Sequence, residues 1–297
     1  MNCCKLCPRA CGANREDGAT GFCGAGASPR VFRWGPHFGE EPPLVGKNGS
    51  GCVFFSRCTM KCIYCQNSPW SWGGKGEDVS TQRLAEILRE LAVKDGCSNW
   101  NLVSPTPYLP FIRDAATALR NEGIKLPFVW NSSGYESTET LDEYKELCDT
   151  ALFDLRYSRN ETAIKASAAP RYVESARAAI SWAFNRGRTS PADTPPLIVR
   201  ILVLPGHADE AIENLAWLAT ELSPEIPVSI MSQYTPAYRA LDEAPLNRKI
   251  TEEEYESVTE AAADFGFENG WIQGFEAADP ALALLGENMQ SGHGCVS

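Results

Sequence analysis

The sequence lacks the features that mark several common classes of protein. It has no excess of positive charge, because 27 lysines and arginines face 38 aspartates and glutamates, for a net charge of −11. A nucleic-acid-binding domain needs a basic surface, so we expect no nucleic-acid partner. No apolar run approaches the roughly 18 residues of a membrane span, and the N-terminus has no apolar signal core. We therefore expect a cytoplasmic protein with no membrane partner.

Histidine is also scarce, whereas cysteine is abundant. Only three histidines occur, and no Gly-x-Ser-x-Gly turn or complete phosphate-binding loop is present. His37 lies beside two glutamates, but an isolated histidine is a weak sign of a site, so we expect it to pack. Seven of the 12 cysteines form two short groups. In a reducing compartment such groups indicate metal or cluster ligands rather than disulfides, and a cluster open to oxygen would favour an anaerobic setting.

The second cysteine group has the spacing C-x3-C-x2-C and consists of Cys58, Cys62 and Cys65. Three thiolates in one loop suit an iron–sulfur cluster better than zinc, because a closed structural zinc site uses four ligands. A cluster held by three cysteines leaves one iron open to a small molecule. Tyr64 precedes the last cysteine, and its ring can stack on a flat base. The alternative interpretation is a zinc knuckle.

The first cysteine group lies in a short segment that is rich in proline, glycine and arginine. Its ligand candidates are Cys4, Cys7, Cys11 and Cys23. A segment with so little apolar material cannot build a hydrophobic core and needs a cross-link to stabilise it, and a four-cysteine metal site supplies one. Zinc would make the site structural, whereas a second 4Fe–4S cluster would relay electrons, and the spacing does not separate these two interpretations.

Residues 31–50 are predicted to form an extended connector. Gly35, Pro36, Pro42 and Pro43 argue against a regular helix there. The sequence therefore divides into a cysteine-rich module with a connector, residues 1–50, and a main domain with a C-terminal extension, residues 51–297.

Apolar and amphipathic segments alternate from residue 51 onward. The predicted strands contain the apolar runs 53–55, 102–103, 128–130, 152–155, 197–204 and 228–231. Ser80 is a good N-cap for the helical pattern at 84–91, and residues 251–254 form a capping box for a late helix. Six β/α units predict an α/β fold, a partial (β/α)6 TIM-like barrel. In such barrels the reacting groups lie at the carboxyl ends of the strands, and Cys58 follows the first strand closely.

Polar residues at or near the strand ends are the candidates for the rest of the site. They are Ser104, Thr106, Asn131, Ser133, Asp154, Arg156, Arg200 and Gln233, and Asn67, two residues after the cysteine loop, is a further candidate. Each one alone is more often ordinary turn chemistry, but their shared position on successive strands favours a binding site. Cys52, Cys97 and Cys148 are isolated in apolar contexts, so we expect them in the core.

The C-x3-C-x-aromatic-C pattern resembles the signature of the radical S-adenosylmethionine (SAM) superfamily. About residues 4–255 resemble, more closely, the pyruvate formate-lyase activating enzyme-like proteins with a cysteine-rich N-terminus. The runs that carry this resemblance are CKLCPRACG (4–12), GFCGAG (21–26), GPHFGEEPPL (35–44), CQN (65–67), NLVSPT (101–106), NSSGYE (131–136), VRILVLPG (199–206) and MSQY (231–234).

The resemblance implies a mechanism and a set of partners. Cys58, Cys62 and Cys65 would bind a 4Fe–4S cluster whose open iron chelates SAM, with Tyr64 near the adenine. One electron from a reductant such as flavodoxin or ferredoxin would split SAM and release a 5′-deoxyadenosyl radical, which abstracts hydrogen. The implied substrate is a glycine in a glycyl radical protein.

Two departures from the activating-enzyme pattern bear on that substrate. Ser104 and Thr106 stand where activating enzymes carry a Gly-Gly-Glu that holds the SAM amino group. Asp154 and Arg156 stand where they carry Asp-x-Lys, and arginine offers a planar fork instead of a point charge. The alternatives are therefore a peptide or small-molecule substrate, a cluster that passes electrons without SAM, and a non-catalytic zinc adaptor.

Overall fold

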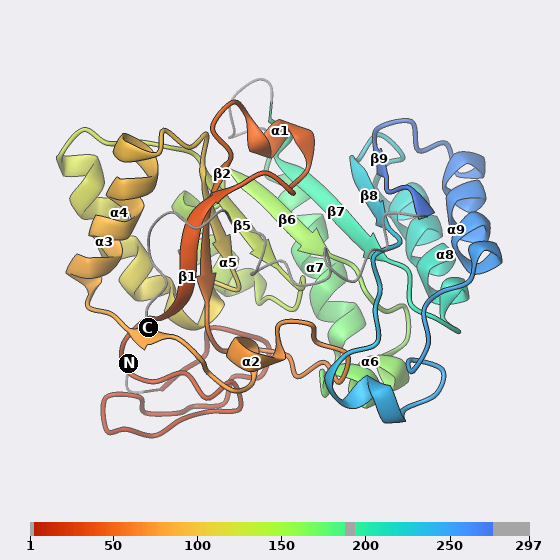
Figure 1. The fold of residues 1–297 in the computed structure, drawn as a ribbon, viewed down its shortest axis with the longest axis horizontal. Helices are drawn as coiled ribbons and strands as arrows, with labels where there is room; N and C mark the ends of the chain where they lie inside the picture. The colour runs from red at the N-terminus through yellow and green to blue at the C-terminus, as the bar shows by residue number, and fades with distance from the viewer. Residues whose placement is uncertain (1–2, 188–193, 276–297) are drawn as a thin grey trace.

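The computed structural model describes residues 3–187 and 194–275, which form one nine-stranded sheet covered by helices (Figure 1). The strand order is β3-β1-β2-β4-β5-β6-β7-β8-β9. Seven strands run parallel: β2 (Ser50–Phe55), β4 (Trp100–Val103), β5 (Phe128–Ser132), β6 (Thr150–Asp154), β7 (Leu197–Leu202), β8 (Val228–Met231) and β9 (Gly270–Ile272). Two antiparallel strands, β1 (Arg30–His37) and β3 (Glu77–Asp78), complete one edge.

Helices connect the successive parallel strands. The α-helices are α1 (Pro42–Val45), α2 (Ser68–Ser71), α3 (Thr81–Arg89), α4 (Leu109–Asn121), α5 (Thr138–Glu143), α6 (Asn160–Ser167), α7 (Tyr172–Asn185), α8 (Ala208–Trp217) and α9 (Glu252–Asp264). Single turns of 3₁₀-helix lie at Thr106–Tyr108, Lys145–Leu147 and Tyr238–Asp242, and short π-helical turns extend α3 and α8 at Glu90–Lys94 and Leu218–Leu222. No helix among the described residues is long and apolar enough to cross a membrane.

The predicted partial (β/α)6 barrel is confirmed. Each of the six apolar runs overlaps one parallel strand, β2 or β4–β8, although runs 152–155 and 197–204 extend past the ends of β6 and β7, and each strand is followed by helix. The helix starts are also as predicted, because the Ser80 side chain accepts from the Arg83 N–H, and Thr251 and Glu254 form a reciprocal capping box. The seventh parallel strand, β9, was not predicted, since it has only three residues and two of them are exposed.

The predicted connector at residues 31–50 is wrong in part, because its first half is strand β1. This strand pairs antiparallel with β2, with Pro36 opposite Gly51 and His37 opposite Ser50. Pro42 and Pro43, which were expected to exclude a helix, begin the four-residue helix α1. Proline is tolerated there because the first N–H groups of a helix have no intrahelical partner.

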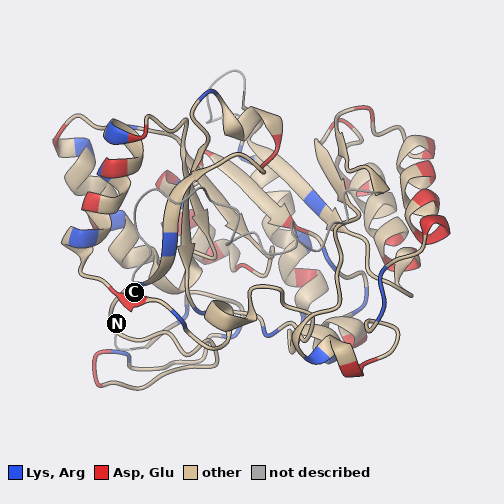
Figure 2. Cartoon of the chain, in the orientation of Figure 1, with Lys and Arg blue, Asp and Glu red and all other residues tan. Residues whose placement is uncertain are grey.

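Helix α9 carries several acidic residues (Figure 2). Glu252, Glu253 and Glu254 occupy the first turn of α9. Negative charge at a helix N-terminus is favourable because it meets the positive end of the helix dipole. Part of the net negative charge of the chain therefore has a local structural role.

Helix α1 closes the amino-terminal end of the partial barrel. In Figure 1 α1 lies at the top, at the amino-terminal ends of the parallel strands, whereas α2 lies at the bottom, at their carboxyl ends. Leu44 from α1 is fully buried and packs against Val129, Leu152 and Ile198 of three neighbouring strands. The loop and helix from Gly39 to Val45 thus form a floor beneath the strands, and this floor leaves the carboxyl ends for the cysteine loop.

Replacement of Leu44 by alanine is expected to lower the free energy of unfolding by about 2–5 kcal/mol, because it removes a buried side chain and leaves a cavity. Urea denaturation followed by circular dichroism measures this loss. Phe38→Ala is the matched control, since Phe38 lies near α1 but is 59% exposed, and its effect should stay within about 0.5 kcal/mol. Equal effects of the two variants would contradict the packing role of Leu44.

Candidate active site

A cavity of about 390 Å³ lies inside the partial barrel, between the cysteine loop and the floor. Every site candidate from the main domain lines it except Thr106: Cys58, Cys62, Tyr64, Cys65, Asn67, Ser104, Asn131, Ser133, Asp154, Arg156, Arg200 and Gln233. The carboxyl ends of parallel strands meet at one edge of a sheet, which explains why residues so far apart in sequence converge.

The cysteine loop, residues 58–65, is held by backbone hydrogen bonds to the end of α6. The N–H groups of Lys61 and Ile63 donate to the carbonyls of Ser167 and Ala166, at 2.9 and 2.8 Å. The last carbonyls of a helix have no intrahelical donor, so the loop satisfies them. On the other side of the loop, the Arg239 N–H donates to the Ile63 carbonyl at 2.9 Å.

The N-terminal segment also contacts the cysteine loop. Arg9 Nε donates to the Thr59 carbonyl at 2.7 Å, and Arg9 Nη2 donates to the carbonyl of Ala168, just after α6. Arg9 lies close enough to Cys58, Cys7 and Cys23 for the charge of each to act on it. A single arginine therefore lies between the two cysteine groups.

The thiols of Cys58 and Cys65 are harder to ionise than that of an ordinary cysteine. Burial, followed by the nearby Cys62, raises the pKa of Cys58 to about 12 and that of Cys65 to about 11. Arg156 acts in the opposite direction on both. Several buried thiolates need a compensating cation, and a metal cluster supplies it, since coordination deprotonates a thiol outright.

The donor set fits a 4Fe–4S cluster bound by three cysteines. Among residues 3–187 and 194–275, no three His, Cys, Asp or Glu side chains surround a point where one metal ion would sit. Each cysteine of a 4Fe–4S cluster binds a different iron, so its ligands need not surround a single point. Cys58, Cys62 and Cys65 meet the looser requirement, because all three line one end of the same cavity.

Polar atoms without partners lie beside the cysteine loop. Asn67 Oδ1 and Arg156 Nε are buried and have no hydrogen-bond partner within the described part of the chain, and both residues line the cavity. Arg156 Nη2 bonds Asp154 Oδ2 at 2.6 Å, which keeps the guanidinium in place. Buried polar atoms are normally satisfied, so these two favour a polar ligand in the cavity.

Tyr64 and Ser104 are held rigidly at the cavity wall. Tyr64 is 3% exposed, and its ring centroid lies 5.8 Å from that of Tyr234 and 6.0 Å from the Arg156 guanidinium. Ser104 follows β4 with a φ of 58°, a left-handed conformation that costs a non-glycine residue energy. Strain of this kind is typical of positions that a binding site fixes.

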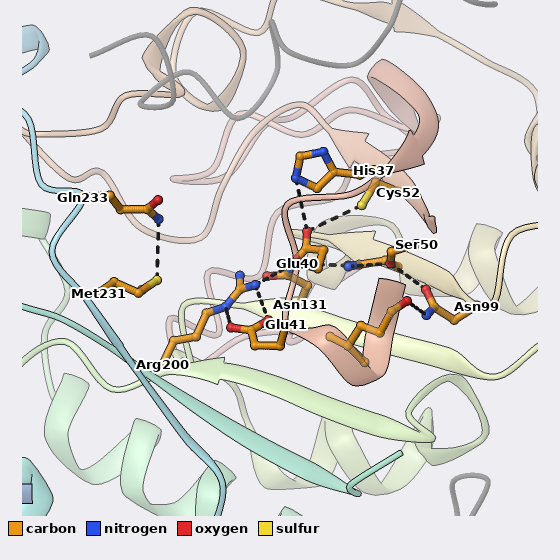
Figure 3. Close-up of polar contacts among 12 residues, drawn as sticks. His37, Glu40, Glu41, Ser50, Cys52, Asn99, Asn131, Arg200, Met231 and Gln233 are labelled. Atoms are coloured by element: carbon orange, nitrogen blue, oxygen red, sulfur yellow. Dashed lines mark hydrogen bonds and ion pairs between the residues drawn. The ribbon is translucent and has the colours of Figure 1, made fainter. Parts of the chain in front are cut away.

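The floor of the cavity carries a buried ion-pair cluster that the sequence did not reveal (Figure 3). Arg200 Nε and Nη2 donate to the two Glu41 carboxylate oxygens at 2.7 and 2.6 Å, and Nη2 also contacts Glu40. Burial raises the pKa of Glu41, but the charge and hydrogen bonds of Arg200 outweigh it and leave that pKa below its ordinary value. Arg200 lines the cavity as predicted, but its guanidinium group is bonded to Glu40 and Glu41.

One signal in the sequence could have identified these carboxylates. Glu40 and Glu41 stand together in a loop between aromatic and proline residues, and paired carboxylates in such a context need a buried cation. His37, which was expected to pack, is 7% exposed, and its Nε2 lies 4.0 Å from Glu40.

Thr106, a predicted cofactor-binding residue, does not line this cavity. Thr106 lies two residues beyond Ser104, where the chain has left the cavity for a 3₁₀ turn. Its hydroxyl donates to both carboxylate oxygens of Glu136, at 2.7 and 2.9 Å. Burial raises the pKa of Glu136 to about 7. Thr106 therefore satisfies a buried carboxyl group beneath the N-terminal segment.

The four cysteines of the N-terminal segment converge on a second, small cavity. Cys4, Cys7, Cys11 and Cys23 line it together with Arg9, Arg15, Phe22 and Thr106. Arg15 Nη2 donates to the sulfurs of Cys4 and Cys23, at 3.2 and 3.8 Å. Burial raises the pKa of Cys7 to about 12. The four predicted ligands are thus neighbours, with a guanidinium against two of them.

Comparison with known proteins finds one matching family, one protein that is similar in sequence and one protein whose solved structures are similar. The sequence profile of the radical SAM superfamily matches residues 52–219. An uncharacterized protein of Methanocaldococcus jannaschii is 29% identical over 272 residues, which cover 89% of this chain and 75% of that protein. Two structures of Streptococcus suis SuiB are similar in fold: one bound to S-adenosylmethionine (TM-score 0.48, 14% identity, 75% of this chain) and one bound to the precursor peptide SuiA (TM-score 0.46, 16% identity, 76% of this chain). This chain spans about half of the length of SuiB, 50% and 49%.

Arg200→Met is expected to lower the free energy of unfolding by about 3–5 kcal/mol near pH 7, because it leaves two buried carboxylates unpaired. In the wild type the lowered pKa of Glu41 gives stability that is present above the unfolded-state pKa and lost as pH falls. In the variant the unpaired carboxyl groups have raised pKa values, so it gains stability as pH falls. The difference between the proteins should therefore shrink toward low pH, as urea denaturation at pH 8 and pH 5 measures.

A triple variant, Glu40→Gln, Glu41→Gln and Arg200→Met, provides the control. It removes all three charges together, so most of the lost stability should return. A loss in Arg200→Met that is the same at both pH values would contradict the assignment of the cost to buried carboxylates.

Proposed function

Because the chain belongs to the radical SAM superfamily, we propose that it is an enzyme that cleaves SAM reductively to a 5′-deoxyadenosyl radical and abstracts hydrogen from a substrate. When bound by Cys58, Cys62 and Cys65, a 4Fe–4S cluster supplies the electron for this cleavage. The observation that carries the proposal is the position of the three thiols at one end of a cavity whose walls hold polar atoms without partners.

The residues beside the cysteine loop suit the polar groups of SAM. Arg156 keeps an unpartnered Nε and a fork fixed by Asp154, and such a guanidinium binds a carboxylate well. Asn67 offers an unpartnered acceptor, Oδ1, which suits an ammonium or hydroxyl group. Tyr64 offers a buried ring for the adenine. Ser104, Asn131, Ser133 and Gln233 add hydroxyl and amide groups for the ribose or the substrate.

The substrate that we propose first is a glycine C–H in a partner protein, as in glycyl radical activation. This proposal rests on the sequence resemblance, and the amide and hydroxyl side chains of the cavity wall suit a peptide backbone. Peptides and small molecules are the competing substrates, since Arg156 replaces the lysine of the activating-enzyme pattern. The electron donor that we propose is a flavodoxin or ferredoxin.

The N-terminal cysteines are proposed to hold a second 4Fe–4S cluster that relays electrons to the first. Arg9 supports this role, because it bonds the cysteine loop and also lies close to Cys7 and Cys23. Arg15 donates to two of the four sulfurs, and such hydrogen bonds stabilise the negative charge of thiolate ligands. A structural zinc ion is the alternative occupant.

Anaerobically reconstituted protein is expected to release 5′-deoxyadenosine from SAM when dithionite is added. A Cys58→Ala, Cys62→Ala, Cys65→Ala variant should release none, because the three thiolates that place the cluster are gone. Chromatography of the quenched reaction measures the product. Cys52→Ala is the control, since this cysteine is buried and lies outside the loop.

Release from wild type and Cys52→Ala alone would establish the cleavage. Absence of product in a wild-type protein that binds zinc and takes up no iron would instead favour the adaptor interpretation. Absence of product in a wild type that takes up iron and sulfide would favour electron transfer without SAM.

Wild-type protein is expected to bind roughly twice as much iron and sulfide per chain as a Cys4→Ala, Cys7→Ala variant, because that variant loses one of two 4Fe–4S clusters. Colorimetric iron and sulfide assays measure the ratio, and zinc is measured in the same samples. Cys3→Ala is the control, as this neighbouring cysteine is exposed and outside the four-cysteine cavity. Equal iron in both proteins, with zinc lost from the variant, would assign zinc to the N-terminal site.

A further inference from the structure

Each sulfur of the cysteine loop lies next to one hydrogen-bond donor. The Met60 N–H donates to Cys58 Sγ at 3.4 Å. The Ser71 hydroxyl lies 3.1 Å from Cys65 Sγ. The Ser167 hydroxyl donates to Cys62 Sγ at 3.0 Å. Two of the three donors are thus serine side chains, from α2 and from the last residue of α6.

The Ser167 hydroxyl belongs to a buried chain of hydroxyl groups. Tyr157 Oη lies 2.5 Å from Ser167 Oγ, and Tyr64 Oη lies 2.5 Å from Tyr157 Oη. Tyr157 and Ser167 are fully buried, and Tyr64 is 3% exposed. The chain therefore connects a ring at the cavity wall with a sulfur of the cysteine loop, through side chains that water does not reach.

The hydrogen bonds of this hydroxyl chain can run in only one direction once Cys62 is a thiolate. A thiolate accepts hydrogen bonds and cannot donate, so the single Ser167 proton must point at Cys62. Ser167 then accepts from Tyr157, and Tyr157 accepts from Tyr64. Hydrogen bonds that run in one direction polarise one another and become stronger, and a buried environment increases this effect.

We propose that Ser167 sets the reduction potential of the cluster through its hydrogen bond to Cys62, and that Tyr157 and Tyr64 are positioning residues that fix the direction of that bond. This inference rests on the proposed function, since it requires a cluster bound at Cys58, Cys62 and Cys65. Ser71 has the same relation to Cys65, but among the residues that the structure describes no further hydroxyl group is bonded to it.

The direction of the effect follows from charge. One electron added to the cluster, with no bond formed or broken, increases the negative charge on the sulfurs. A hydrogen bond to sulfur stabilises the reduced form more than the oxidised form, so it raises the reduction potential. Without Ser167 the cluster would therefore be harder to reduce.

The hydroxyl chain of Tyr64, Tyr157 and Ser167 also couples the cavity wall to the cluster. Tyr64 is the residue proposed to contact the adenine of SAM, and its hydroxyl is the first donor of the chain. A ligand against the Tyr64 ring that shifts this hydroxyl changes the hydrogen bond two steps away at Cys62. Tyr157→Phe breaks this connection and leaves Ser167 in place.

The test is a redox titration of reconstituted full-length protein, with dithionite as reductant and electron paramagnetic resonance as readout. The signal that changes on addition of SAM identifies the cluster with the open iron. In Ser167→Ala we expect the equilibrium constant for one-electron reduction to fall about tenfold, which lowers the midpoint potential by about 59 mV. In Tyr157→Phe we expect a smaller shift in the same direction, because Ser167 can still donate.

Tyr135→Phe is the matched control. Tyr135 is a buried tyrosine whose hydroxyl donates to the Pro170 carbonyl at 2.9 Å, outside the chain. The midpoint potential of Tyr135→Phe should equal that of the wild type. This result would show that a shift in the other variants comes from the hydroxyl chain and not from the loss of any buried hydroxyl group. Iron and sulfide content of each variant shows that the cluster is intact.

A Ser167→Ala protein with an intact cluster and an unchanged midpoint potential would overturn the role of Ser167. A shift in Ser167→Ala with none in Tyr157→Phe would overturn the positioning role of the tyrosines. A wild-type protein that takes up no iron would overturn the proposed function itself, and this inference with it.

Discussion

The backbone hydrogen bonds between the cysteine loop and the end of α6 are the contacts on which the site depends. A loop with three cysteines and little secondary structure has many peptide groups that need partners. Lys61 and Ile63 find theirs in the free carbonyls of α6, and Arg9 secures the same junction from the N-terminal segment. The same contact brings Ser167 to Cys62. Loop position, thiol environment and the hydroxyl chain therefore share one origin.

The parallel strands and the positions of their carboxyl ends could be predicted from the sequence for a physical reason. Strands buried on both faces are continuous apolar runs, and parallel strands place their carboxyl ends together. Asn131, Asp154 and Gln233 were found in the cavity because each lies at such an end. Thr106 was misplaced because the chain turns away between residues 104 and 106, and a strand-end argument does not resolve a single turn.

The floor could not be predicted in the same way. Residues 39–45 reach the cavity because β1 returns antiparallel beside β2, a pairing between segments that have no shared pattern. Leu44, Glu40 and Glu41 then meet strands more than 80 residues away in the chain. The Glu-Glu pair was visible in the sequence, but its partner Arg200 was assigned to a ligand instead. Long-range charge pairing of this kind needs the tertiary structure.

The sheet formed by the described residues does not close, and this has a consequence for the kind of molecule that can reach the cavity. A complete barrel admits molecules only through its two rims, so a long chain would have to be threaded. Among residues 3–187 and 194–275, the parallel strands stop at β9, whose residues Trp271 and Ile272 line the cavity and leave Ile272 62% exposed. A strand edge beside a cavity can in general accept an extended polypeptide from the side. A polypeptide substrate of the kind proposed above would therefore need no threading, because one residue in its middle could enter while both of its ends stay outside.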